Sequence, residues 1–257
     1  MTNAVLSWIN RLATAVLSTD SEVATLPLAE IVSPHLSDKW QTDGATSAYL
    51  AADFGAVVAI GVVGLFGTNL SASATWRIRL SAIAPGGGEL LDTGVVSMGV
   101  VAGYGQAVHV LSSAVNARYL RIDLDDPDSA AGFLQVGAAW AGPLWQPARN
   151  FAYGAAAGWR DDSVVSRSKG GQAYVDLRPR YRVAEVEFRF LTEAEAFEGA
   201  FEIDRLVGLA GNLLLVPDPG GPWQNRQALL GRLVDATEVQ NAALKVFAKR
   251  YRLEERR

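Results

Sequence analysis

A period-two alternation of apolar and polar residues around Trp76 constrains the fold of this chain more than any other feature. The side chains expected to face a core are Trp76, Ile78, Leu80 and Ala82, and those expected to face solvent are Thr75, Arg77, Arg79 and Ser81. This pattern is typical of a strand with one buried face. An almost uncharged run at positions 57–66 precedes it, separated by a polar turn at positions 67–69. Two such strands predict the core of a β-sandwich.

The rest of the first half repeats this pattern. Strands are predicted at positions 119–124 and 133–140 and, as a pair around Gly94, at positions 90–101. In the strand at 133–140 we expect Leu134, Val136, Ala138 and Trp140 to share one face. No segment of this half has helical periodicity, so the first half is predicted to be all-β.

Charge and proline mark a domain boundary. Residues 1–150 hold 7 Lys+Arg and 12 Asp+Glu, whereas residues 151–257 hold 16 and 15, so the net charge changes from −5 to +1. The change falls near Pro143 and Pro147, which favour extended or turning chain. We therefore expect two domains, at residues 1–145 and 146–257.

The second half predicts a sheet with one helix. Strands are expected at positions 174–177, 184–190, 212–216, 228–235 and 244–253. In the strand at 184–190, Ala184, Val186, Phe188 and Phe190 are expected to share the buried face. Thr192 and Glu195 have the spacing of a capping box, which predicts a helix over about 192–207. Phe197 and Phe201 are one turn apart and are expected to pack against the sheet. The predicted fold class is mainly β, with a β-sandwich followed by a smaller sheet-plus-helix (α+β) domain.

Composition excludes several classes of function. The chain has no cysteine, which rules out disulfides and a cysteine-based zinc site, and it has only two histidines, His35 and His109. The net charge of −4 argues against nucleic-acid binding. No apolar run is long enough for a membrane span. No cofactor is predicted.

Two groups of carboxylates are the candidate chemical sites. Asp123, Asp125, Asp126 and Asp128 have oxygen ligands for Ca²⁺, although a solvated turn before Pro127 is the simpler interpretation. A carboxylate pair for glycoside hydrolysis would have to come from Glu185, Glu187, Glu193, Glu195 and Glu198. Strand alternation and helix capping already explain most of these glutamates.

Other catalytic arrangements are poorly supported. The two histidines lie in separate segments, and Ser163, Ser166 and Ser168 lack the context of a nucleophile elbow. The glycine runs 86–88 and 220–221 lack the residues that follow in phosphate-binding loops and are interpreted as turns. We therefore expect no catalytic residue, no metal ligand and no enzyme activity.

The first half also resembles a known family. In chain order, its matching segments are a Trp, Tyr-Leu-Ala-Ala-Asp-Phe-Gly (49–55), Gly-Thr-Asn (67–69), Trp-Arg-Ile-Arg-Leu-Ser (76–81), Ala-Arg-Tyr-Leu-Arg-Ile-Asp-Leu (117–124) and Leu-Gln-Val-Gly-Ala-Ala-Trp-Ala-Gly (134–142). This order is similar to that of the galactose-binding-like, or discoidin-type, jelly roll. The likeness covers residues 36–142 and implies a jelly-roll sandwich. Phe54 departs from the leucine usual in the family, and the ligand-carrying loops do not align.

The second half resembles tail-tip proteins of long-tailed bacteriophages and prophages, the ring-forming distal tail proteins among them. The similar segments are Gly158–Ser163, Ser166, Gly170-Gly171-Gln172, Tyr181-Arg182, Phe190-Leu191-Thr192, Leu214–Pro219 and Gly231-Arg232-Leu233. The resemblance implies a virion structural protein of the tail tip or baseplate. Such a protein forms a ring, for example a hexamer, and contacts the tail tube and the tail hub or tape-measure proteins. It is made in the host cytoplasm.

The leading hypothesis is therefore a structural subunit that assembles through its second domain and links the tail tube to host-recognition proteins. The alternative is a carbohydrate-binding module for host surface glycans, with Trp40 and Tyr104 stacking on sugar faces. Partial burial of both aromatic side chains is the competing interpretation. An enzyme subunit that carries a binding domain is the third hypothesis. A ring of about six copies would favour the first hypothesis, and glycan binding by monomers the second.

Overall fold

The computed structural model describes residues 2–256, which divide into two compact units. Of the described residues, the first unit holds 2–148 and 212–230, and the second holds 149–211 and 231–256. The expected boundary near Pro143 and Pro147 lies close to this first division. Residues 212–230, however, were expected in the second domain and lie in the first unit. The chain therefore passes between the units three times.

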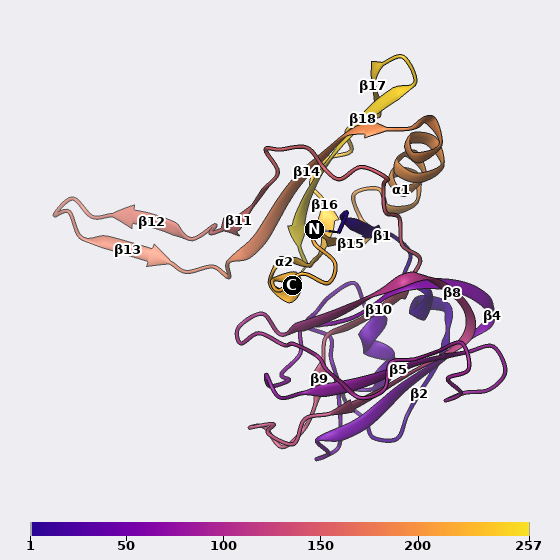
Figure 1. The fold of residues 1–257 in the computed structure, drawn as a ribbon. Helices are drawn as coiled ribbons and strands as arrows, with labels where there is room; N and C mark the ends of the chain where they lie inside the picture. Colours follow the sequence, from indigo (N-terminus) through magenta and orange to yellow (C-terminus); the bar gives the residue numbers. More distant parts are fainter. Residues whose placement is uncertain (1, 257) are drawn as a thin grey trace. The chain divides into compact units, whose positions relative to one another are not determined.

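The first unit is an all-β sandwich with short helical turns (Figure 1). Its strands are β1 (Val5–Ser7), β2 (Val16–Thr19), β3 (Trp40–Gln41), β4 (Ser47–Phe66), β5 (Thr75–Ser81), β6 (Leu91–Asp92), β7 (Val96–Ser97), β8 (Gln106–Asp125), β9 (Gln135–Val136), β10 (Ala138–Gly142) and β15 (Leu213–Val216). Its helical turns are the 3₁₀ turns η1 (Arg11–Thr14) and η2 (Leu28–Val32) and the helix α2 (Gln224–Gln227).

Two strands of 20 residues, β4 and β8, form the centre of the sandwich. They are antiparallel neighbours in the order β10-β4-β8-β5-β6, and β2 and β7 pair with β4 and β5. The Asp-Phe-Gly segment, Asp53–Gly55, lies inside β4. Gly55 there has φ of 73°, and the register with β8 shifts between Asp53 and Val58. This irregularity lets one strand bend and continue.

The alternation around Trp76 places the core as predicted. Trp76, Ile78 and Leu80 of β5 are buried and join the main hydrophobic cluster with residues of β4 and β8. The predicted register fails at the end of the strand, where Ala82 is exposed and Ser81 is buried. The Ser81 hydroxyl donates to Glu89 Oε1 (2.7 Å) and accepts from the Ile83 amide (3.0 Å), so a hydrogen-bonded turn ends the alternation.

A second apolar cluster lies on the other face of the β10-β4-β8 sheet. It contains residues of these strands, such as Val62 and Trp140, together with Leu214 and Val216 of β15. β15 pairs with β1 in antiparallel register. Trp140 was expected to share a face with Val136, but the strand breaks at Gly137 and the two side chains belong to different clusters. Both faces of this sheet are therefore buried.

The second unit is a sheet covered by one helix. Its elements are β11 (Ala156–Arg160), β12 (Val164–Arg167), β13 (Ala173–Asp176), β14 (Tyr181–Leu191), the π-helical segment η3 (Glu195–Ala200), α1 (Phe201–Val207), β17 (Gln240–Ala243) and β18 (Val246–Glu255). The strand β16 (Leu229–Leu233) enters from the first unit, and its residues 231–233 pair with β18. β18 also pairs with β14, which pairs with β11.

The predicted capping box begins the helix. The Thr192 amide donates to Glu195 Oε2 (2.8 Å), and the Glu195 amide donates to Thr192 Oγ1 (3.3 Å). The expected packing of Phe197 and Phe201 on the sheet is found only in part. The Phe197 ring contacts Phe247 of β18 (centroids 5.1 Å apart), but both phenylalanines remain exposed. The buried side of the helical segment carries small or aliphatic residues. Phe190 was also expected to face inward. A register shift between Phe188 and Leu191 exposes Phe190 and buries Leu191.

A buried ion pair joins the helix to the sheet in the second unit. The Lys249 ammonium donates to Asp204 on α1 and to the Thr237 carbonyl. Burial raises the pKa of the Asp204 carboxyl, and the hydrogen bond from Lys249 opposes that rise. The Tyr251 hydroxyl donates to the Ala200 carbonyl (3.2 Å) nearby. These polar contacts fix the helix against β18. Among residues 2–256, no helix is long and apolar enough to cross a membrane.

Candidate functional site

The most unusual feature of the second unit is a two-stranded arm, residues 161–180, that projects away from its sheet (Figure 1). β12 and β13 pair only with each other and are joined by a turn at 168–171 in which the Gly171 amide donates to the Ser168 carbonyl (2.9 Å). Nine residues lead from the base to the tip, a reach of about 30 Å at strand rise. Every residue of β12 and β13 is exposed.

One face of the arm is apolar. Residues directly opposite each other in an antiparallel pair point to the same side, so the register Val165↔Val175 puts these two side chains on one face. By the period of two, Leu177 lies on the same face. Val165, Val175 and Leu177 are 59%, 52% and 80% exposed. An isolated two-stranded hairpin is marginally stable in water, so this face is suited to being covered by something else.

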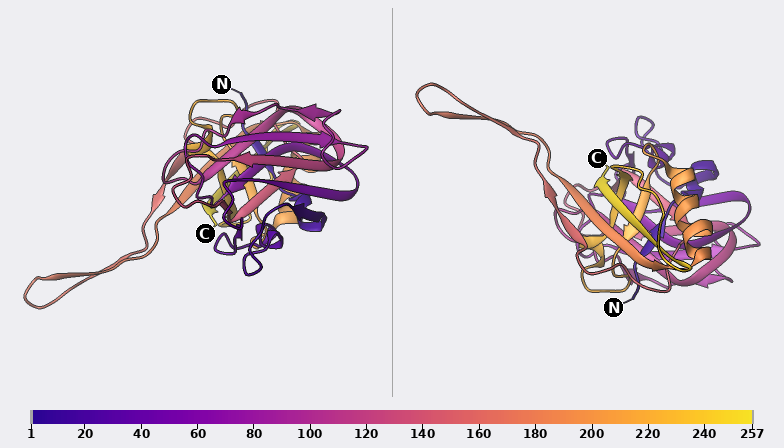
Figure 2. Two further views of the ribbon diagram at one scale, coloured as in Figure 1. Left: turned by 90° about the horizontal axis from the view of Figure 1, so that it is seen from below. Right: turned by 90° about the horizontal axis from the view of Figure 1, so that it is seen from above.

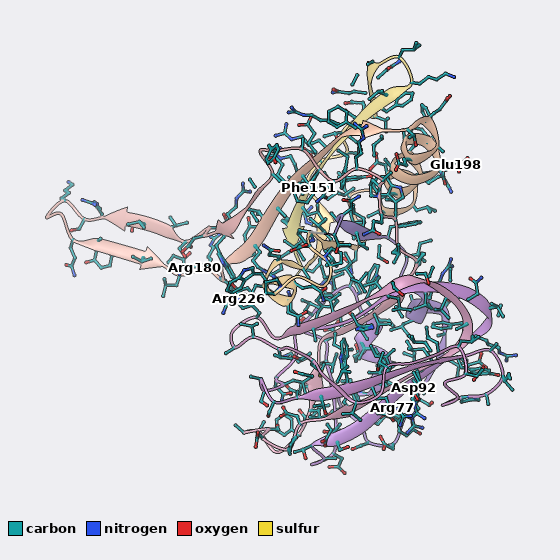
Figure 3. The ribbon with its side chains drawn as sticks, in the orientation of Figure 1. Arg77, Asp92, Phe151, Arg180, Glu198 and Arg226 are labelled. Atoms are coloured by element: carbon teal, nitrogen blue, oxygen red, sulfur yellow. The ribbon has the colours of Figure 1, made fainter. Side chains whose placement is uncertain are left out.

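The base of the arm is fixed by hydrogen bonds. Arg180 Nε donates to Asp161 Oδ2 (2.9 Å), and the Tyr181 hydroxyl donates to Asp162 (2.9 Å). Hydrogen bonds from Ser163 and Arg180 lower the pKa of the Asp161 carboxyl to about 2. Asp161 is therefore charged across the physiological range, and the arm leaves the sheet in a defined direction. Figure 3 shows Arg180 at this junction.

The tip of the arm is basic. Arg167 ends β12 just before the turn and Lys169 lies within it. Both are exposed, and neither forms an ion pair with any of residues 2–256. The other charged residues of the arm differ, because Arg178 is 3.7 Å from Asp176 and Arg180 pairs with Asp161. The tip thus offers two unneutralised cations at the end of an apolar face.

The two aromatic residues singled out for glycan stacking occupy different environments. Trp40 is 0% exposed and lies in the main core, where its Nε1 donates to the Ser21 carbonyl (3.1 Å). It therefore has no free ring face for a ligand, and its prediction as a glycan contact is corrected. Tyr104 is half-buried beside Arg226, whose guanidinium lies 5.9 Å from the ring centroid. The structure does not bring Trp40 and Tyr104 together at one site.

An open hollow of about 430 Å³ lies elsewhere in the first unit. Trp76 and His109 line it with rings in an edge-to-face contact (6.2 Å, 89°), and Gln224 and Asn225 line the opposite part. Burial lowers the pKa of His109, so its imidazole is neutral at physiological pH. Asn225 and Gln224 hold the backbone of Val108, so they shape the hollow as well as line it.

The acidic strand end is a hydrogen-bonded turn. Asp126 is buried, and its two oxygens accept from the Ser71 amide (2.7 Å) and hydroxyl (2.5 Å). Asp123 accepts from Arg79 (2.6 Å) and Arg121 (2.8 Å). Within residues 2–256, no group of three or more His, Cys, Asp or Glu side chains is arranged to hold a metal ion. The Ca²⁺ interpretation has no geometric support there.

Most of the glutamates weighed for hydrolysis have structural partners. Glu185 pairs with Arg250 and Arg252, Glu187 with Arg189, and Glu195 caps the helix. Glu193 and Glu198 lie exposed on the helical segment. The Ser163 and Ser168 hydroxyls accept hydrogen bonds from backbone amides of the arm. His35 is exposed in a loop. These side chains do not converge on a reactive centre.

A strand was predicted at 174–177, but its pairing into a projecting arm was not. The available signal was Gly170-Gly171 between Val164–Arg167 and Ala173–Asp176, because a glycine-containing turn between two β-prone segments predicts a hairpin. No sequence pattern indicated that this hairpin would lack neighbours. That property depends on the absence of packing partners in the folded unit.

Comparison with known proteins gives a likeness of limited extent. No family model matches the sequence, and no curated protein matches it. Solved structures that are similar include the lectin domain of lectinolysin complexed with Lewis B antigen, at 13% identity over 53% of this chain and 98% of that chain, with a TM-score of 0.42. The family 32 carbohydrate-binding module from C. perfringens NanJ in complex with galactose is 14% identical over 55% of this chain and 99% of that chain, with a TM-score of 0.43.

A fucose-binding module from Streptococcus pneumoniae is also similar, with 12% identity over 52% of this chain and 94% of that chain and a TM-score of 0.40. These neighbours are carbohydrate-binding domains, and each matches about half of this chain. Likeness at this level carries no inference about a ligand of this chain. The structure itself is mainly β, as predicted, with an antiparallel sandwich and a smaller unit that carries the helix.

Proposed function

We propose that this chain is a structural subunit that assembles with further copies of itself through the arm of its second unit. The observation that carries the proposal is the apolar face of Val165, Val175 and Leu177, which is open to water on a hairpin with no other strand beside it. Burying one such side chain contributes about 1.5–3 kcal/mol. Covering the face by another subunit would offset the cost of ordering the arm.

The chemistry of the chain supports an assembly role over catalysis. The carboxylates and hydroxyls weighed as catalytic groups are mostly held in structural hydrogen bonds and ion pairs. Among assembled particles, we propose the tail tip of a long-tailed bacteriophage, the family that residues 150–257 resemble. The partners would then be further copies in a ring, the tail tube, and the tail hub or tape-measure proteins, and the location would be the virion.

An arm-replacement variant of the full chain tests this proposal. Residues 162–179 are replaced by Asn-Gly, which closes a two-residue hairpin between Asp161 and Arg180. We expect the unaltered chain to form a closed oligomer, about six copies for a tail ring, in native mass spectrometry, and the variant to be monomeric with a similar melting temperature. An oligomer of unchanged size in the variant would overturn the proposal.

Glycan binding by the first unit is the second candidate, and the hollow beside Trp76 and His109 favours it. The hollow combines ring edges with the polar side chains of Gln224 and Asn225, the mixture that sugar sites use. The neighbours described above bind Lewis B antigen, galactose or fucose, according to their descriptions. A glycan array with the arm-replacement variant tests this function separately from assembly. Signal that His109→Ala abolishes would support it, and no signal on any glycan would overturn it.

A further inference from the structure

An arm that joins two copies must contact a particular surface, here called its acceptor, on the neighbouring copy. The helical segment of the second unit carries an exposed surface of matching chemistry. Phe197 and Phe201 are 46% and 53% exposed, with ring centroids 6.2 Å apart, and Phe197 also contacts Phe247 (5.1 Å). Two exposed phenylalanines side by side form an apolar patch of the kind that marks an interaction site.

The charge around this patch is acidic. Glu193 and Glu198 flank the phenylalanines, both are exposed, and neither forms an ion pair with a residue in the described range 2–256. We call Glu193, Phe197, Glu198 and Phe201 the helix face. Like the arm, it combines an apolar patch with two unneutralised charges, and the charges have the opposite sign.

The arm and the helix face lie on opposite sides of the second unit. Figure 2, in the view from above, shows the arm and the helix projecting from opposite ends of the sheet, and Figure 3 shows Glu198 on the helix, far from Arg180. An arm therefore does not reach the helix face of its own chain. A contact between the two must join different copies, and it would be head-to-tail.

We propose that the arm of one copy docks on the helix face of the next copy. Val165, Val175 and Leu177 would cover Phe197 and Phe201, while the basic tip meets the acidic flank. This inference rests on the proposed assembly function and names the surface that completes it. Because each copy carries one arm and one helix face on opposite sides, the contact repeats from copy to copy and closes into a ring when the rotation allows.

A charge exchange in the full chain tests this pairing. Arg167→Glu with Lys169→Glu puts like charges at the contact, as does Glu193→Lys with Glu198→Lys. We expect each double variant to weaken self-association by roughly tenfold or more in sedimentation velocity, because facing like charges oppose docking. Combining all four substitutions restores opposite charges, and we expect it to restore association to near the original level.

The control for the four-substitution variant is Lys39→Glu with Glu238→Lys, because both variants leave the net charge unchanged. Lys39 and Glu238 form no ion pair within the described residues and lie outside both surfaces. Circular dichroism melting shows whether each variant is folded. If the unaltered chain associates but the four-substitution variant is not restored, the helix face is not the acceptor and the assembly function stands. If the unaltered chain is monomeric at all concentrations, the assembly function and this pairing both fail.

Discussion

At the scale of single residues, burial separates side chains that look equivalent in the sequence. Trp40 and Trp76 lie in the core, whereas Trp223 is largely exposed and lies against Arg226, with the guanidinium 5.1 Å from its ring centroid. An indole contributes to stability mainly through the apolar area that it removes from water. The same residue type therefore has very different effects at these positions.

Trp76→Ala is expected to lower the free energy of unfolding by about 3–5 kcal/mol, because it leaves a large cavity in the main core. Trp223→Ala is the control in the same unit, and we expect it to cost only about 0.5–1 kcal/mol through its contact with Arg226. Urea denaturation measures both. Equal midpoints for the two variants would contradict the burial that separates them.

The charge at the base of the arm gives a prediction for acid pH. Asp161 has a pKa of about 2 in the folded chain, lowered from 3.8. A carboxyl with a lowered folded pKa stabilises the fold above its unfolded pKa, and this contribution is lost as pH falls from about 4 towards 2. A carbon-detected NMR titration of the Asp161 carboxyl should have its midpoint at about pH 2. In Arg180→Ala the midpoint should rise, and an unchanged value would show that Arg180 does not interact with Asp161.

At the scale of elements, the sequence predicts strand alternation and helix capping, but it does not predict which strand each element pairs with. The alternation at Trp76, Ile78 and Leu80 and the capping box at Thr192 depend on neighbouring residues, and the structure confirms both. The burial of Phe190 was mispredicted because a register shift in β14 changes which side chain faces inward. Such a shift depends on the paired strand β18, which no local pattern specifies.

The helix and the two candidate sites show the same limit. The extent of the helix was predicted, but its exposed phenylalanines were not, because apolar spacing does not distinguish a face packed on a sheet from one left for a partner. Trp40 was selected for its residue type and proved to be a core side chain. The hollow at His109 is built by segments more than 100 residues apart in the sequence, so it could not be predicted from spacing.

Two glycines on strands provide a prediction at this scale. A Cβ atom at Gly142 would lie 2.0 Å from the Ile9 carbonyl oxygen, whereas at Gly158 nothing lies within 4 Å. We expect Gly142→Ala to destabilise the chain by about 1–3 kcal/mol or more, because two backbone segments must separate. Gly158→Ala should be neutral or slightly stabilising. Thermal melting of both variants measures the difference, and an unaffected Gly142→Ala would show that Ile9 does not approach β10 so closely.

At the scale of the whole molecule, the division into units is not a division of the sequence into two halves. The first unit consists of residues 2–148 and 212–230. The second unit is formed by the segments that follow each of these in the sequence, 149–211 and 231–256. A fragment of residues 150–257 would remove β15 from its partner β1 and expose Leu214 and Val216. The assembly experiments above therefore use the full chain.

Limited proteolysis provides a prediction for the whole chain. Because the arm makes few contacts, trypsin should cut first after Arg167 or Lys169, before it cuts near Pro143 and Pro147. After that cut, the fragments should stay together on a sizing column, because β1 pairs with β15 in the first unit and β11 pairs with β14 in the second, and each pair spans the cut. Intact-mass analysis over time identifies the first site. Initial cleavage inside β4 or β8 would contradict this order.

The pairing of β1 with β15 also has a consequence for synthesis on the ribosome. Val5 pairs with Val216, so β1 waits for a partner strand that is made more than 200 residues later. The apolar surface shared by β1, β4 and β10 stays uncovered while residues 143–212 are made, although the central sandwich strands are already complete. Long-range pairing of this kind slows folding and leaves a nascent chain prone to aggregation. The yield of folded protein should therefore depend on how fast residues 143–216 are translated and on chaperones that cover this surface.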